Sequence, residues 1–216
     1  MVSNRELVLV LATVTAFILH GLFFIHHDLG MTEFVAIDYA KKTALFFICV
    51  LPPVLRRVAR QAFSAPGVPW SGRSWFNIHI LMVMAGFLLA DQMLYWFGVF
   101  LDRRFGYLEF AFFPTYNDDI IKYVDLTFGL FWNSIAEELF YRAILIAALF
   151  RVVRHQGVRI FIAGILFGAV HWSQGWVWLA AITAMGWMLG YLYCLTRSIA
   201  PGIVIHTLHN VIAFTQ

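Results

Sequence analysis

Three short groups of polar residues stand out in a chain that is otherwise strongly apolar. The first covers residues 137–142 and reads EELFYR. Because Glu138 and Arg142 are four residues apart, they lie on one face of a helix and can form an ion pair. Glu137 is turned about 100° away from that face and has no cation nearby on its own helix. The group therefore holds one carboxylate more than a structural ion pair needs, and this excess suggests chemistry.

The other two groups supply histidine and asparagine side chains. His171 ends the run FGAVH, and residues 206–210 read HTLHN. His206 and Asn210 share one helical face, whereas His209 lies at its edge. An imidazole can donate or accept a hydrogen bond or bind a metal, and an amide can donate a hydrogen bond. These side chains are therefore candidates for acid–base chemistry.

The composition predicts where these groups operate. Of 216 residues, 62% are hydrophobic and 12% are charged, whereas soluble domains carry about 25% charged residues. This excludes a soluble globular domain and a disordered chain, and a formal charge of +3 is too small to indicate a nucleic-acid-binding protein. We therefore expect an all-α polytopic membrane bundle of about seven transmembrane helices.

The apolar runs between charged residues place the expected helices. They lie at about residues 7–26, 37–55, 77–100, 123–150, 158–172, 176–196 and 200–215. Lys41 and Lys42 are expected to snorkel near the start of the second span. Residues 102–122 form the longest expected loop, and their aromatic side chains favour an interfacial belt over a lid.

The loop charges predict an orientation for the chain. The loops on the same side as the N-terminus hold nine basic residues and one acidic residue. The loops on the opposite side hold five basic and eight acidic residues. Cytoplasmic loops are enriched in Lys and Arg. We therefore expect an integral protein of a bacterial inner or plasma membrane with a cytoplasmic N-terminus.

In this topology the three polar groups reach similar depths on three different helices. Glu137, His171, His206 and Asn210 are therefore expected to meet in one pocket in the outer half of the bilayer. A carboxylate, two imidazoles and an amide are the groups needed to activate a water molecule and to stabilise an oxyanion.

The EExxxR, FxxxH and HxxxN elements, in this order on successive membrane helices, resemble the CPBP intramembrane protease family. This family is also called the CAAX protease and bacteriocin-processing, or Abi, family. The resemblance covers about residues 123–216, the expected catalytic core, and residues 1–122 carry N-terminal helices and the aromatic-rich loop within the same membrane domain. It implies an intramembrane endopeptidase that cleaves a membrane-anchored or C-terminal segment. An outward pocket suits exported or C-terminally sorted proteins.

The resemblance also implies a catalytic set: Glu137, Glu138, Arg142, His171, His206 and Asn210. In this set Glu137 activates the water and His171 cooperates with it. Arg142 holds the second glutamate, and His206 and Asn210 stabilise the oxyanion. His209 falls outside the pattern.

A zinc mechanism is the alternative chemistry. Glu137, His171 and His206 would form a three-ligand set that leaves one position for water. Asn210 is a poor zinc ligand and suits hydrogen-bond donation better, which favours a glutamate hydrolase without a cofactor. Asp91, a further intramembrane charge, is expected to bind a backbone amide or Arg142, or to lie near the outer interface.

A membrane protein without enzymatic activity is the rival from another class. It would be an immunity or scaffold protein with the same fold, or a transporter using the same polar pocket. Transporters often carry repeated halves, and the sequence shows no such repeat. The expected partners are membrane lipids and a membrane-anchored protein or peptide substrate, with no nucleic acid.

Overall fold

The computed structural model describes residues 8, 12–13, 15–16, 18–19, 30–53, 55–57, 77–105, 118–150, 152–172 and 175–215. The regular structure in these ranges is entirely helical, which confirms the all-α prediction. Five helices are α2 (Met31–Val50), α4 (Ile78–Phe105), α8 (Gln156–Ala169), α9 (Trp176–Thr196) and α10 (Ala200–Thr215). One continuous helical run contains α5 (Asp119–Val124), η1 (Asp125–Gly129), α6 (Leu130–Glu138), η2 (Leu139–Leu145) and α7 (Ile146–Leu149), where η marks a π-helical stretch.

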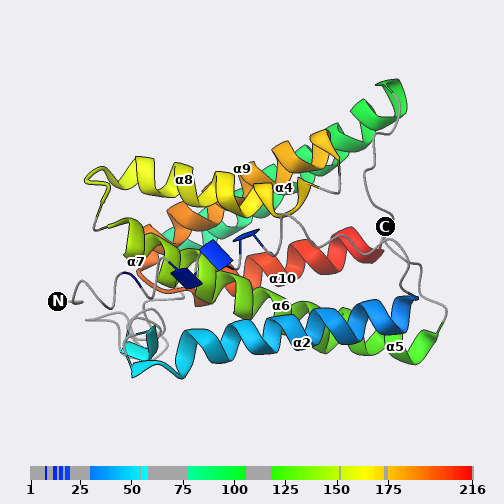
Figure 1. Cartoon of the computed structure of the whole chain (residues 1–216). Helices are drawn as coiled ribbons and strands as arrows, with labels where there is room; N and C mark the ends of the chain where they lie inside the picture. Colours follow the sequence, from blue (N-terminus) through cyan, green and yellow to red (C-terminus); the bar gives the residue numbers. More distant parts are fainter. Residues whose placement is uncertain are drawn as a thin grey trace.

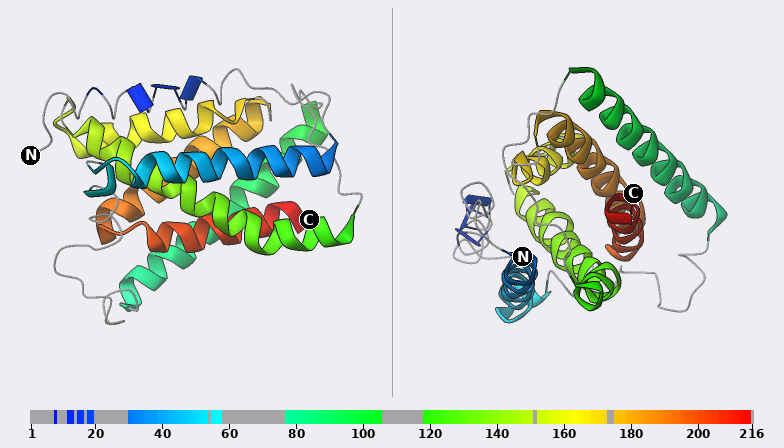
Figure 2. Two further views of the ribbon diagram at one scale, coloured as in Figure 1. Left: turned by 60° about the horizontal axis from the view of Figure 1, so that its bottom comes forward. Right: turned by 90° about the vertical axis from the view of Figure 1, so that its right-hand side faces the viewer.

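The helical run from α5 to α7 is the centre of the arrangement (Figure 1). Helix α2 packs along one side of it, against α6 and η2, and α10 packs on α6 from another side. Helices α8 and α9 lie beside each other, and α4 leans across α9 and α10 at an angle (Figure 2). The run thus lies between α2 and α10, which is where its polar side chains find partners.

Two of the helices, α4 and α9, are long and apolar enough to cross a membrane by length and composition. Helix α4 exposes large apolar side chains along its length, with Met93 74% exposed and Trp96 and Phe97 each 57% exposed. A band of this kind is unfavourable in water and suits lipid contact. The predicted count of seven spans is not confirmed, and most of the first predicted span lies outside the described residues.

The helix bounds agree with the sequence prediction best in the C-terminal half. Helices α9 and α10 have the predicted bounds, and the predicted break between α8 and α9 is present. Helix α2 differs, because it begins at Met31 rather than near residue 37 and ends at Val50, just before two prolines. The predicted loop 102–122 is helical at both described ends, and residues 106–117 lie outside the described part of the chain.

Local signals explain where several of these helices begin and end. The Asp118 side chain caps α5 by accepting a hydrogen bond from the Ile120 amide at 2.7 Å, as expected of an N-cap aspartate. Gly175 precedes α9 with φ 96°, a conformation that glycine adopts without strain. Pro201 lies in the first turn of α10, where its missing N–H has no helical partner to lose.

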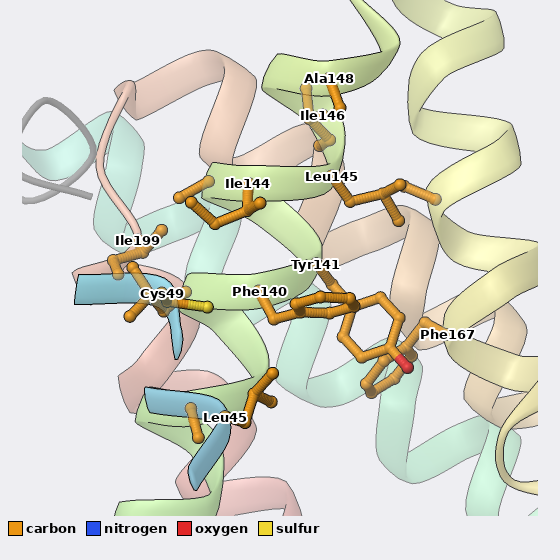
Figure 3. Close-up of a cluster of buried hydrophobic side chains, with 14 of the residues drawn as sticks. Leu45, Cys49, Phe140, Tyr141, Ile144, Leu145, Ile146, Ala148, Phe167 and Ile199 are labelled. Atoms are coloured by element: carbon orange, nitrogen blue, oxygen red, sulfur yellow. The ribbon is translucent and has the colours of Figure 1, made fainter. Parts of the chain in front are cut away.

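The main hydrophobic core surrounds the π-helical stretch η2 (Figure 3). Its members come from α2, η2, α7, α8 and the start of α10, and include Leu45, Cys49, Phe140, Tyr141, Ile144, Leu145, Phe167 and Ile199. The Phe167 ring meets the Tyr141 ring edge to face, with centroids 5.0 Å apart. The core therefore fixes α2 and α8 against the segment that follows the glutamate pair.

Four glycines let α8 and α9 approach each other closely. Gly164 and Gly168 lie four residues apart on α8, and Gly186 and Gly190 are spaced in the same way on α9. A Cβ on Gly186 would lie 3.0 Å from the Gly164 Cα, and a Cβ on Gly164 would overlap the Trp187 ring. Small residues four apart are typical of tightly packed membrane helices. This packing holds the end of α8, next to which His171 lies.

We predict opposite effects from two glycine-to-alanine changes on α8. Gly164→Ala should destabilise the protein, because overpacking costs about 1–3 kcal/mol. Gly157→Ala should leave stability unchanged or slightly raised, because open space surrounds that position and alanine favours a helix. The measurement is the thermal unfolding midpoint in detergent, and a G164A midpoint at or above that of the wild type would contradict the packing account.

Candidate active site

Glu137 and Glu138 end α6 at the point where the helix becomes π-helical. Both carboxylates are buried, Glu137 at 3% exposure and Glu138 at 0%. Short π-helical turns inside α-helices are often found at functional sites. A buried carboxylate needs a cation or hydrogen-bond donors to remain charged, so the partners of these two residues define the site.

Glu138 pairs with Arg142, as the four-residue spacing predicted. The Arg142 Nε lies 3.2 Å from the Glu138 Oε2, and both side chains are fully buried. The guanidinium also stands over the Phe167 ring, 4.7 Å from its centroid, a favourable cation–π geometry. On the α10 side, a Cβ on Gly202 would lie 2.7 Å from the Glu138 Oε2, so glycine makes room for the carboxylate.

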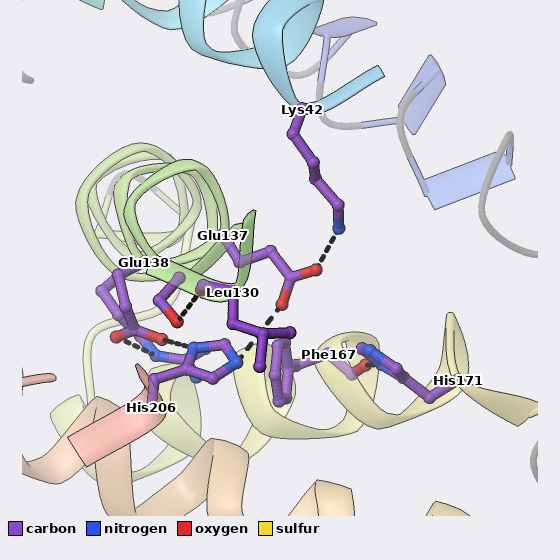
Figure 4. A network of polar contacts seen from close by, with 9 residues as sticks. Lys42, Leu130, Glu137, Glu138, Phe167, His171 and His206 are labelled. Carbon is purple, nitrogen blue, oxygen red and sulfur yellow. Dashed lines mark hydrogen bonds and ion pairs between the residues drawn. The ribbon is translucent and has the colours of Figure 1, made fainter. Parts of the chain in front are cut away.

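His206 joins the two glutamates (Figure 4). Its Nδ1 lies 3.1 Å from the Glu138 Oε1, and its Nε2 lies 3.5 Å from the Glu137 Oε2. A carboxylate that is paired with Arg142 can only accept, so the His206 Nδ1 carries the hydrogen. The His206 Nε2 therefore faces Glu137 either as a lone pair or, in the charged imidazolium, as a donor.

Lys42 on α2 forms an ion pair with the Glu137 Oε1. Its side chain is largely buried, at 13% exposure. The expectation that Lys42 snorkels near the start of a span is therefore wrong, because the ammonium group turns inward to the carboxylate. Glu137 has no cation on its own helix, as expected, and its cation comes from α2, a helix far away in sequence.

His171 lies just beyond the end of α8, and its Nδ1 is 2.8 Å from the Phe167 carbonyl oxygen. A carbonyl can only accept, so Nδ1 is the donor and Nε2 of the neutral ring is left as an acceptor. The Phe167 ring stands between the two imidazoles, with its centroid 5.1 Å from that of His171 and 5.7 Å from that of His206 (Figure 4). Glu137 and His206 thus meet directly, while His171 is separated from His206 by this ring.

Asn210 lies one helical turn beyond His206 on α10. Its Nδ2 is buried and finds no hydrogen-bond acceptor among the described residues. A buried donor that is left unpaired costs free energy and is normally satisfied. This amide is therefore available for a ligand that brings an oxygen atom.

Asp91 and His209 form a separate pair that ties α4 to α10. The His209 Nδ1 lies 2.6 Å from the Asp91 Oδ2. The expected partners of Asp91, a backbone amide or Arg142, are thus replaced by His209, because Arg142 is already paired with Glu138. His209 therefore contacts α4 and anchors the helix that carries His206.

The zinc alternative finds no ready ligand group in the described part of the chain. No cluster of three or more His, Cys, Asp and Glu side chains there is arranged to hold a metal ion. Lys42 already occupies one oxygen of Glu137, and a second cation at the same carboxylate would be repelled by the ammonium.

We predict that the Glu138–Arg142 pair is a stability determinant. Arg142→Met should lower the free energy of unfolding by about 3–5 kcal/mol, because it leaves a buried carboxylate without its cation. The double variant Glu138→Gln with Arg142→Met should recover most of this loss, and Arg154→Met, at an exposed position, serves as the charge control. Denaturation in mixed detergent micelles measures all four proteins, and equal losses in the single and double variants would contradict the pairing.

The chain was compared with known proteins. Residues 120–212 match the family model described as Rce1-like, type II CAAX prenyl endopeptidase Rce1-like. Searches of curated proteins and of solved structures found no match. The matched segment begins at the second residue of α5 and ends within α10. It therefore contains all six expected catalytic residues and excludes α2 and α4.

Proposed function

We propose that this protein is an intramembrane endopeptidase of the glutamate type, in agreement with the match of residues 120–212 to the Rce1-like family of CAAX proteases. The substrate is a membrane-anchored peptide that is cleaved near its C-terminus. The observation that carries the proposal is that two buried carboxylates, those of Glu137 and Glu138, both contact the imidazole of His206. A structural ion pair would need only one of them.

Glu137 is the general base of the proposed reaction. Its Oε2 accepts no hydrogen bond within the described part of the chain, so a lone pair is free to take a proton from water. The water oxygen then forms a bond to the scissile carbonyl carbon, and the carbonyl electrons move to its oxygen. The neutral His171 Nε2 is a second acceptor that can orient the same water. General-base catalysis of this kind contributes about 10²–10⁴-fold to a rate.

His206 and Asn210 stabilise the oxyanion in this scheme. In the charged form of His206, its Nε2–H and the Asn210 Nδ2–H are two donors that α10 carries one turn apart, and such donors act strongly in a site that excludes water. Glu138 and Arg142 do not touch the substrate. They fix the His206 Nδ1–H, in the way that a buried carboxylate orients a catalytic histidine. When the intermediate collapses, the proton on Glu137 moves to the leaving nitrogen and the C–N bond breaks.

The proposed substrate class is supported by the family description and by the expected orientation of the chain. The family description names a type II CAAX prenyl endopeptidase, whereas the loop charges favour a site that opens away from the cytoplasm. Both are satisfied by a peptide whose lipid or apolar segment lies in the bilayer and whose C-terminal residues enter the site. We therefore propose that membrane anchoring, rather than the prenyl group itself, is the shared requirement.

We predict that Glu137→Gln lowers kcat by at least about 100-fold, because the amide cannot take a proton from water. The assay uses the purified full chain in lipid vesicles with two probes, a farnesylated CAAX peptide and an unprenylated peptide with a transmembrane anchor. Product is read by mass spectrometry. The matched control is Asp119→Asn, which removes an exposed carboxylate from the same helical run. An E137Q variant as active as D119N would refute the role of Glu137 as general base. Absence of cleavage of both probes by the wild type would instead favour a membrane protein without enzymatic activity.

We predict that the activity does not depend on a metal ion, because Lys42 supplies the positive charge at Glu137. Incubation with EDTA and 1,10-phenanthroline should leave kcat within about twofold of the untreated value, well below the 10²–10⁴-fold effect of losing an essential group. Loss of activity on chelation together with recovery on addition of zinc would establish the zinc mechanism instead.

A further inference from the structure

Helix α2 lies outside the segment that matches the family model, yet it reaches the centre of the candidate active site. The contact is the ion pair between the Lys42 Nζ and the Glu137 Oε1 (Figure 4). Ninety-five residues separate the two in sequence. Lys42 therefore reaches the site from outside the segment that holds the six motif residues.

Lys42 supplies the cation that Glu137 otherwise lacks. Glu137 and Glu138 bring two negative charges into a buried region, and Arg142 neutralises Glu138 alone. An unpaired buried carboxylate is expensive, so Glu137 needs a cation that does not depend on the protonation of His206. Lys42 is that cation, and Asp38, one turn earlier on α2, adds a favourable interaction with the ammonium group.

The Lys42 contact also determines which oxygen of Glu137 remains available to accept a proton. Its ammonium binds Oε1, while Oε2 faces the His206 Nε2 at 3.5 Å. A carboxylate held by one oxygen has its second oxygen fixed in direction, as a positioned general base requires. Without Lys42 the Glu137 side chain would be free to rotate toward other donors.

Two further contacts hold α2 in the position that this pairing needs. The Tyr39 hydroxyl donates to the Asp125 Oδ1 at 2.7 Å, and the Trp132 Nε1 donates to the Thr43 Oγ1 at 3.2 Å. These contacts flank Lys42 on the same helix and attach α2 to η1 and α6. The position of the Lys42 ammonium group is thus fixed by the packing of α2 against η1 and α6.

We propose that Lys42 is a positioning residue of the active site: it holds Glu137 by Oε1 as a charged base and directs Oε2 to the attacking water. This inference rests on the proposed hydrolase function. It means that the catalytic site is completed by the N-terminal part of the chain, which carries no family motif.

The test compares Lys42→Met, Lys42→Arg and Lys41→Met in the vesicle assay described above. Lys42→Met should lower kcat by about 10-fold or more with KM changed by less than about twofold, the pattern of an interaction needed in the transition state. Lys42→Arg should restore part of kcat, because the guanidinium can still bind Oε1. Lys41→Met removes the same charge from the next position, about 100° around the helix, and should resemble the wild type.

A thermal unfolding cycle of wild type, K42M, E137Q and the double variant accompanies the kinetics. Lys42→Met should destabilise the wild type and be nearly neutral in the E137Q background, where no buried charge is left unpaired. Wild-type kcat in K42M, or equal destabilisation in the two backgrounds, would overturn the inference. If the wild type cleaves neither probe, the proposed function fails, and the unfolding cycle still decides whether Lys42 supports Glu137.

Discussion

A carboxylate in a low-dielectric interior is stable only beside a cation or hydrogen-bond donors, and this constraint organises the whole molecule. Two adjacent buried glutamates need two partners, and one helix supplies only Arg142. The result is a continuous series of charged and polar groups, Arg142–Glu138–His206–Glu137–Lys42, that crosses from η2 through α10 and α6 to α2. Three separate stretches of the chain must therefore pack together before the site exists.

The surrounding helices serve that requirement. The core around η2 fixes α2 and α8 against the glutamate pair, and the Asp91–His209 contact attaches α10 to α4 at the turn that follows His206. Close packing of α8 on α9 through glycines places the end of α8, where Phe167 separates His171 from His206. The site is thus rigid on the carboxylate side, and His171 and Asn210 provide polar groups for a water molecule and a substrate oxygen.

Local patterns in the sequence predicted much of this, and non-local pairing accounts for what they missed. Helices α9 and α10 and the Glu138–Arg142 pair follow from apolar runs, proline and glycine positions and four-residue spacing, all of which act within one element. Lys42 and Asp91 bind partners that are 95 and 118 residues away in sequence. The periodicity of apolar residues within one helix cannot predict such pairs. The expectation that Lys42 snorkels also hid this partner, although a lysine within an apolar helix is itself a signal of an inward partner. The glycines of α8 and α9 were also a readable signal, because their four-residue spacing indicates close helix packing.

The central claim is that water attacks a peptide carbonyl held between Glu137 and the donors of α10. The most direct measurement is a structure of the Glu137→Gln variant in lipid with an uncleaved anchored peptide bound. We predict that the scissile carbonyl oxygen lies within about 2.7–3.2 Å of the His206 Nε2 and the Asn210 Nδ2, with the carbonyl carbon facing residue 137. A peptide bound elsewhere, or one whose carbonyl points away from both donors, would contradict it.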